Sequence, residues 1–312
     1  MPLSLSRGTV TAVLERHEGL VRLEVDGVPC VAYPGLTGPV EPGDEVLVNV
    51  QARALELGSG GFDVLYANLT RGLGLAAEPG AHVMKLPYTP LQAAVRHGEE
   101  DGALADSLAG LPVVCCSLHS QVAPVCAALA GRRVAYVQLP GGALPVALSD
   151  ALRELRARGL VETTVAADAC IAADVHCVNV YSALAWCAAA GMEAVVCSVG
   201  PGIIGTGTAL GHGAVAAAIA VNAAHALGGR PVLAPRVSEA DPRERHQGLS
   251  HHTRAVLDLC LVAPAVPEDL APEGWREACE GLTLSHMGRG PDEDPSFFAA
   301  AYAAGLAASG PG

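Results

Sequence analysis

The chain has 312 residues, of which 51% are hydrophobic and 16% charged, and its formal net charge is −13. This length predicts one large domain with a smaller one, and the composition excludes a disordered chain. The negative charge argues against nucleic acid and anionic membranes as partners, because the sequence contains no basic patch. We therefore expect a small-molecule ligand, no nucleic acid and no membrane.

Cysteine usage and the first residues predict a cytoplasmic location. The ten cysteines lie mostly in apolar runs and show no CxxC pair, so we expect buried free thiols. MPLSLSRGTVTAV lacks the long apolar region of a signal peptide. The most apolar helix-like run, AVAAAIAVNAAHAL, is too short to span a bilayer.

Residues 1–68 read as short strands between turns. The runs GTVTAVLERH, GLVRLEVDGVPCVAY, DEVLVNVQARAL and FDVLYANL alternate or contain β-branched residues, with turn signals at Asp26-Gly27 and Gly43-Asp44. This pattern predicts a small antiparallel β-barrel or sandwich module without catalytic residues.

Residues 69–110 are predicted to be a polar connecting segment with irregular backbone. Pro90 is expected to stand near the start of a helix in PLQAAVRHGEE. Lys85 is the only lysine among nineteen basic residues, so we expect its ammonium to meet an anionic ligand or to form a Schiff base. The expected pocket residues of this segment are His82, Lys85, Tyr88 and Gln92.

Residues 111–312 alternate apolar runs with helical stretches. The predicted strands are 111–118, 133–139, 161–169, 192–200 and 231–238, and the predicted helices are 121–131, 143–160, 179–191, 213–229 and 251–262. Continuously apolar strands in β-α units predict an α/β domain whose mostly parallel sheet is covered by helices on both faces, a Rossmann-like three-layer arrangement.

Five polar or glycine-rich clusters follow the predicted strands, and ligands in such sheets bind beyond the carboxyl ends of the strands. We therefore expect one composite site. Its pocket residues outside the anion loop are Gly141, Gly142, Asp168 and Asp174, with Ser149 and Asp150 two turns into a helix. The two aspartates either orient an imidazole or bind a metal, or they are ordinary loop residues.

The loop in SVGPGIIGTGTALGHGAV precedes a long helix and contains no GK[ST]. Its backbone N–H groups and hydroxyls suit an anion near a helix N-terminus, although a tight loop that needs glycine conformations fits as well. The anion-binding candidates here are Gly200, Gly202, Thr206, Gly207 and Thr208.

RVSEADPRERHQGLSHHT, residues 236–253, is the most polar stretch. Arg236, Arg243 and Arg245 suit bidentate anion binding. Ser250 is the expected N-cap of a helix whose first turn holds His251 and His252, and the helix dipole there favours neutral imidazoles fit for acid–base work.

The catalytic candidates from the residues alone are Asp241, His246, His251, His252 and His119. Asp241 and His246 with one of His251 and His252 form a candidate divalent-metal site, since neighbouring histidines are not expected to share one ion. His119 is expected as a site wall or acid–base group, or as a structural residue. No GxSxG elbow is present, so a Ser–His hydrolase is not expected.

The motifs HVMKLPYTPLQ, LHS, GGALP with SD, VNVYSALAW, GPGIIGTGT and RVSEADPRERHQGLSHHT resemble those of the bacterial family described as domain of unknown function 3866. The resemblance covers nearly the whole chain and implies that these stretches are the hallmark positions. One departure is VAADACIAAD, where the family pattern implies a histidine with glycines.

The sequence predicts an enzyme of transferase or hydrolase type acting on a small anionic or phosphorylated metabolite. The alternatives are a non-catalytic ligand sensor or scaffold, and a divalent-metal-dependent hydrolase. Cofactors are left open apart from that metal, and an uncovered sheet edge would favour a homo-oligomer.

Overall fold

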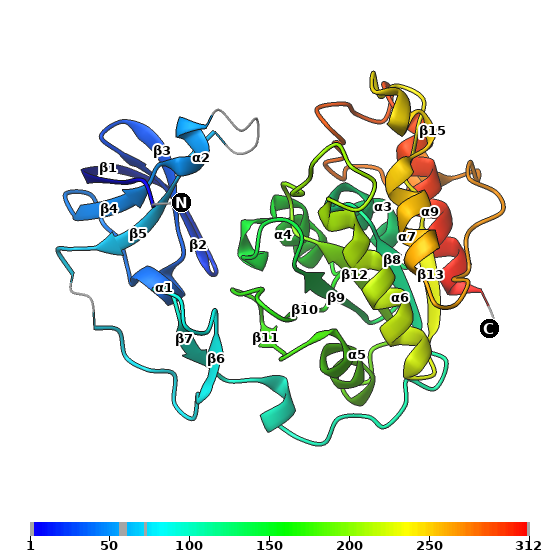
Figure 1. Ribbon diagram of the computed structural model, residues 1–312, viewed down its shortest axis with the longest axis horizontal. Coiled ribbons are helices and arrows are strands. Elements are labelled where there is room, and N and C mark those ends of the chain that lie inside the picture. The colour runs from blue at the N-terminus through cyan, green and yellow to red at the C-terminus, as the bar shows by residue number, and fades with distance from the viewer. Residues whose placement is uncertain (1–2, 56–60, 72–73, 311–312) are drawn as a thin grey trace. The chain divides into compact units, whose positions relative to one another are not determined.

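The computed structural model describes residues 3–55, 61–71 and 74–310. The chain divides between Arg96 and His97 into two compact units (Figure 1). This boundary falls inside the segment 69–110.

The first unit contains a closed β-barrel, which confirms the predicted barrel. Its strands are β1 (Leu5–His17), β2 (Leu20–Val25), β3 (Val28–Ala32), β4 (Glu45–Asn49) and β5 (Asp63–Asn68), joined in the order β1-β2-β3-β5-β4. The barrel is not wholly antiparallel, because β3 and β5 pair in parallel. Directions can alternate around a closed ring only when the number of strands is even, so a ring of five needs such a pair.

Two segments of this unit differ from the prediction. The run 51–54, expected as strand, is the short helix α2 (Gln51–Ala54), which follows α1 (Pro34–Thr37) in chain order. The segment after Pro90, expected as a helix, forms β7 (Ala93–Val95), which pairs antiparallel with β6 (Val83–Lys85). Proline suits a turn as well as a helix start, and cross-strand pairing decided between them.

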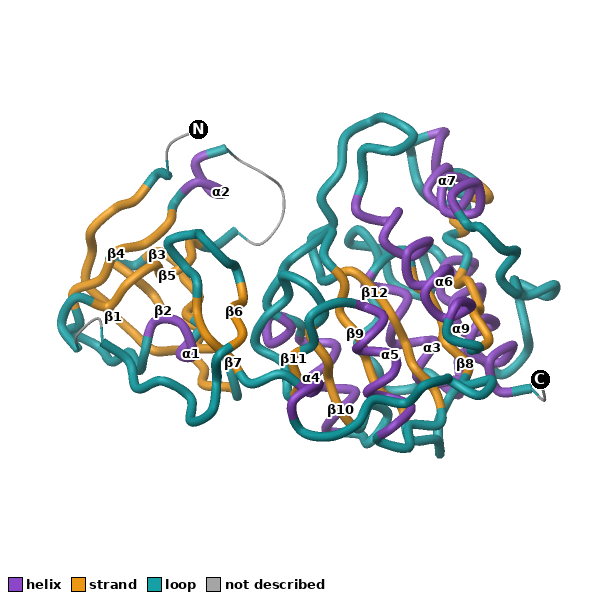
Figure 2. Tube along the Cα trace, turned by 60° about the horizontal axis from the view of Figure 1, so that its bottom comes forward, coloured by secondary structure: helices purple, strands orange, loops and turns teal. Residues whose placement is uncertain are grey.

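The second unit is built on a six-stranded, wholly parallel sheet with the order β11-β10-β9-β12-β8-β13 (Figure 2). Its strands are β8 (Pro112–Cys116), β9 (Val134–Leu139), β10 (Thr163–Ala166), β11 (Val175–His176), β12 (Ala194–Val199) and β13 (Arg230–Ala234). The α/β class and the parallel sheet are thus confirmed.

Helices cover both faces of this sheet. Alternate strand residues belong to two separate cores: Val113, Cys115 and Val137 pack with one set of helices, and their neighbours Val114 and Cys116 pack with the other. The first set is α5 (Val180–Ala189), α6 (Ala216–Ala226) and α7 (His251–Leu259), and the second is α3 (Val122–Ala128), α4 (Asp150–Ala157) and α9 (Pro295–Ser309). Helix α9 was not among the predicted helices.

Helix α4 begins later than predicted. Ser149 is its N-cap, with the hydroxyl accepting a hydrogen bond from Leu152 N, so Ser149 and Asp150 do not lie two turns inside a helix. The residues before it form the 3-10 turn Val146–Leu148, and Val146 N donates to Ile171 O at 2.8 Å. The smaller elements are β14 (Val237–Ser238), which pairs with β15 (Gly248–Leu249), and α8 (Trp275–Ala278).

The chain leaves the neighbouring strands β8 and β12 towards opposite faces of the sheet. Helix α3, which follows β8, packs on one face, and α6, which follows β12, packs on the other. Ligands in open α/β sheets bind at such a point, beyond the carboxyl ends of the strands. The strand order itself differs from that of dinucleotide-binding Rossmann folds.

The ten cysteines are free thiols, and nine of them are buried, as expected. Among the described residues, no helix has the length and apolar character required to cross a membrane.

Candidate functional site

Four histidines from two distant parts of the second unit converge beyond the ends of β12 and β13. We call His212, His246, His251 and His252 the histidine cluster. The closest rings are those of His212 and His252, which stack with centroids 3.9 Å apart. His251 lies 4.5 Å from His252, 4.8 Å from His246 and 5.4 Å from His212, also between centroids.

Local structure holds each of these side chains. His212 follows the glycine-rich loop and precedes the 3-10 turn Gly213–Val215 that leads into α6. Ser250 is the N-cap of α7, as the polar stretch predicted, and its hydroxyl accepts from His252 N at 3.2 Å. The same hydroxyl lies 2.7 Å from Nδ1 of His246. Ser250 therefore links the helix start to a third ring of the cluster.

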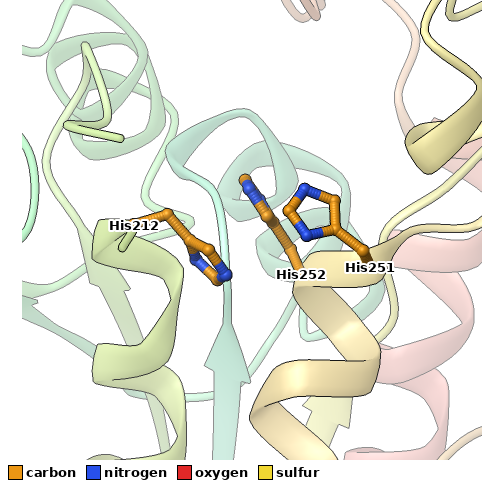
Figure 3. Close-up of side chains that lie close together, drawn as sticks. All are labelled: His212, His251 and His252. Carbon is orange, nitrogen blue, oxygen red and sulfur yellow. The ribbon is translucent and has the colours of Figure 1, made fainter. Parts of the chain in front are cut away.

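One ligand atom from each of His212, His251 and His252 lies within 4.8 Å of the others (Figure 3). The adjacent His251 and His252, which we did not expect to share an ion without a bend, thus each place a ligand atom in the same group. Adjacent helical side chains diverge by about 100°. Rotation about the side-chain bonds nevertheless brings both rings to the side on which His212 lies.

Two ring nitrogens of this trio are unused. Considering the residues that the structure describes, neither Nδ1 of His212 nor Nε2 of His251 has a hydrogen-bond partner, and both atoms are buried. Nε2 of His212 lies 2.9 Å from Ala209 O, and a carbonyl can only accept. The proton of the neutral His212 ring is therefore on Nε2, and Nδ1 carries a lone pair.

The imidazoles of the cluster are neutral at physiological pH. Burial, together with the charges of Arg236 and Arg243, lowers the pKa of His246 to about 3. Burial is also the main cause that lowers the pKa of His252 to about 2, and it lowers the pKa of His212 and His251 in the same direction. Neutral imidazole is the form that binds metal ions or accepts protons.

Beside the cluster lies a buried network of arginines and aspartates. Asp241 accepts hydrogen bonds from Arg243 at 2.7 and 2.8 Å and from Arg236 at 3.2 Å, and Arg289 Nη2 lies 3.5 Å from it. Hydrogen bonds from Arg243 hold the pKa of Asp241 well below its usual range. Asp294 accepts from Arg289 and from Ser238.

The predicted metal trio of Asp241, His246 and His251 or His252 is not the one that the structure brings together. Asp241 is engaged by arginines, and His212 takes its place beside the histidines. Sequence reasoning missed His212. The available signal was a histidine between two glycines, directly before a helix, at the end of a predicted anion loop.

His119 belongs to a separate constellation at the end of β8. Its Nε2 lies 2.6 Å from Ser149 Oγ, and its Nδ1 lies 3.2 Å from Tyr136 Oη and 3.3 Å from Val199 O. Burial lowers the pKa of His119 to about 4. The carbonyl requires a proton on Nδ1, so Nε2 accepts from the Ser149 hydroxyl.

The glycines at this edge allow backbones to touch. A Cβ on Gly142 would lie 2.2 Å from Gly200 O, and one on Gly213 would lie 1.9 Å from Gly141 O. Gly202 has a φ of 68°. The hydroxyls of Thr206 and Thr208 hydrogen-bond to each other at 2.9 Å and to the backbone of the same loop, which also contains Gly207.

The remaining predicted residues lie elsewhere. Asp174 accepts hydrogen bonds from Thr164 N and Oγ1 and pairs with Arg156, while Asp168 and Arg245 are exposed. In the first unit, Lys85 is buried on β6, His82 contacts Gly80 O through Nδ1, and Gln92 accepts from the backbone of the fully exposed Tyr88. The role predicted for Lys85 stays a prediction.

Residues 29–278 match the family described as "Protein of unknown function (DUF3866)". The chain belongs to this family. The match includes the glycine-rich loop and the whole histidine cluster, and it ends before Arg289 and Asp294. No curated protein matches the chain.

Proposed function

We propose that the α/β unit is a metal-dependent hydrolase that acts on a small anionic substrate beyond the carboxyl ends of the sheet strands. The observation that carries this proposal is the convergence of His212, His251 and His252, with one ligand atom of each inside 4.8 Å. The proposal joins the anionic substrate and the divalent metal, which the sequence offered as separate alternatives.

The chemistry of the donors favours a zinc-type ion over magnesium or calcium. Imidazole suits zinc, copper, iron and nickel, whereas magnesium and calcium prefer oxygen ligands. Three protein ligands with an open position are typical of catalytic rather than structural zinc. The contact of His212 Nε2 with Ala209 O supports this reading, since metal-binding histidines commonly donate their other N–H to a carbonyl.

A divalent ion at this place would supply Lewis acidity, polarising a phosphoryl or carbonyl oxygen of the substrate. His246 stands beside the trio with its pKa lowered and its Nδ1 held by Ser250. Its position suits it to hydrogen-bond water or a substrate oxygen beside the ion, while so low a pKa makes it a weak base at neutral pH.

The charges around the cluster support an anionic substrate. Within the part of the chain that the structure describes, Arg236, Arg243 and Arg289 pair with Asp241 and Asp294 alone, which leaves one positive charge in excess. A bound anion would offset that charge. The helices that follow β8 and β12 pack on opposite faces of the sheet, and this reversal supports a binding crevice at the same edge of the sheet. It also supports a Rossmann-like, doubly wound architecture in the broad sense.

The test is metal content and turnover in protein purified without a histidine tag. The wild type is expected to carry close to one zinc-type ion and to hydrolyse at least one member of a panel of phosphate and carboxylate esters. His212→Ala should lose most of the metal and the turnover, because it removes one of three ligands.

His225→Ala is the matched control, since His225 is exposed on α6. It is expected to keep both properties. Wild-type protein without bound metal after incubation with zinc, or equal metal content in the two variants, would contradict the proposal. Metal binding with turnover absent would favour a ligand sensor instead.

A further inference from the structure

We infer that Arg236 couples the metal to an oxyanion of the substrate: it holds His252 when the site is empty and donates to a phosphate-type oxyanion when the metal binds. This inference rests on the proposed function and adds to it a substrate class and a residue. It predicts that metal and oxyanion bind cooperatively.

The first step is the hydrogen bond between Arg236 and His252. Nη1 of Arg236 donates to Nδ1 of His252 over 3.2 Å. A guanidinium only donates hydrogen bonds, so Nδ1 must be the acceptor and carries no proton. The single ring proton of His252 is therefore on Nε2.

A metal ion needs a lone pair from His252, and binding through either ring nitrogen is incompatible with the hydrogen bond from Arg236. If the ion binds through Nε2, the proton moves to Nδ1 and faces another donor. If the ion binds through Nδ1, the guanidinium is displaced directly. In either case, binding of the ion by His252 breaks the contact with Arg236.

The second step is the state of Arg236 itself. It is only 2% exposed, its backbone N–H donates to Thr253 Oγ1 at 2.8 Å, and Nη2 donates to Asp241 at 3.2 Å. Nε is buried, and no acceptor for it exists among the described residues. An unpaired buried donor is unfavourable, and metal binding would release a second one at Nη1. An oxygen of an oxyanion is an acceptor for the N–H that is released at Nη1.

The third step is charge. A divalent ion would stand beside Arg236, with Arg243 and Arg289 nearby. Among the described residues, these arginines pair with Asp241 and Asp294, two negative charges for three positive ones. An oxyanion next to the ion would relieve this repulsion, and a doubly charged phosphate group would do so more than a carboxylate. Because coupling between two sites is reciprocal, the anion must strengthen metal binding as much as the metal strengthens anion binding.

The experiment measures Co²⁺ binding to the full chain by visible absorption, with and without inorganic phosphate. Co²⁺ replaces a zinc-type ion and reports histidine ligation through its spectrum. Phosphate should lower the apparent Kd for Co²⁺ about tenfold in the wild type, within the usual range of coupling between sites. Acetate should have a smaller effect. Complexation of free Co²⁺ by phosphate acts in the opposite direction and cannot imitate this result.

Variants identify the residue responsible. In Arg236→Met, Co²⁺ should bind without phosphate at least as tightly as in the wild type, and the phosphate effect should disappear. Arg254→Met is the matched control, because Arg254 is exposed on α7 and takes no part in the coupling described above. It should keep the phosphate effect. Arg236→Lys, which retains a charge at the buried position, should keep part of it if Arg236→Met fails to fold.

The outcomes separate the two proposals. Co²⁺ bound by histidines with an affinity that phosphate leaves unchanged would overturn the inference and leave the metal site standing. An acetate effect equal to that of phosphate would overturn the assignment of a phosphate-type ligand. A Co²⁺ spectrum that is the same in the wild type and in His212→Ala would overturn the proposed function itself.

Discussion

The protonation states at the sheet edge are decided by individual partners rather than by residue type. Ala209 O holds the proton of His212 on Nε2, and Arg236, by donating to Nδ1 of His252, leaves the proton of that ring on Nε2 as well. His119 is fixed in the same way by Val199 O and Ser149. The contacts of His252 and His119 join residues distant in the chain, so these two tautomers depend on tertiary structure, whereas the contact of His212 with Ala209 is local.

At this scale we predict a pH dependence of stability that involves His119. Burial lowers its pKa from 6.5 to about 4, so the unfolded chain binds a proton that the folded chain excludes between these values. The stabilisation is complete above about pH 6.5 and is lost as the pH falls towards 4. It amounts to at most about 3.5 kcal/mol, at about 1.4 kcal/mol per pKa unit.

The measurement is urea unfolding of wild type and His119→Asn near neutral pH and near pH 5. Asparagine retains hydrogen-bonding groups but does not titrate, so the variant should lose less free energy of unfolding on acidification. Identical losses in the two proteins would contradict the assignment. Other buried histidines, such as His286, act in the same direction in both proteins and cancel in the comparison.

Elements reach their places at this edge because their connecting loops touch backbone to backbone. Gly142 lies against Gly200, and Gly141 lies against Gly213, directly before the helix that follows His212. The glycines that the sequence suggested as an anion cradle thus bring the loops after β9 and β12 together. Their effect on the site is to position His212.

We predict that Gly142→Ala destabilises the α/β unit by about 1–3 kcal/mol, the usual range for overpacking. The added Cβ would lie 2.2 Å from the carbonyl oxygen of Gly200, and backbone cannot move aside as a flexible side chain can. Gly207→Ala is the control, because a Cβ there meets nothing within 4 Å. Chemical denaturation compares the two, and equal stability would show that the loops are not in close contact.

The whole molecule consists of two units, each with its own core. The barrel core lies within the first unit, and the histidine cluster and its arginines all lie in the second. We therefore predict that residues 97–312 fold alone and bind Co²⁺ with the same spectrum as the full chain.

Thermal unfolding and Co²⁺ absorption of that fragment check this prediction. A cooperative transition with an unchanged spectrum is expected, since none of the described cluster contacts involves residues before 97. A fragment that folds but loses the Co²⁺ spectrum would show that the first unit contributes to the site.

The sequence by itself determined the class of the fold, because apolar periodicity and turn residues are local signals that can be recognised without knowledge of tertiary contacts. It placed a small β module, five of the six strands of the parallel sheet with the helices that follow them, the cap at Ser250 and the polar clusters after the strands. Only the tertiary structure decided which side chains meet there. It placed His212 beside His251 and His252, paired Asp241 with arginines, and brought His119 within hydrogen-bond distance of Ser149. The physical reason is that these contacts depend on strand order, on loop backbones that touch and on side-chain rotation. None of these three produces a periodic pattern in the sequence.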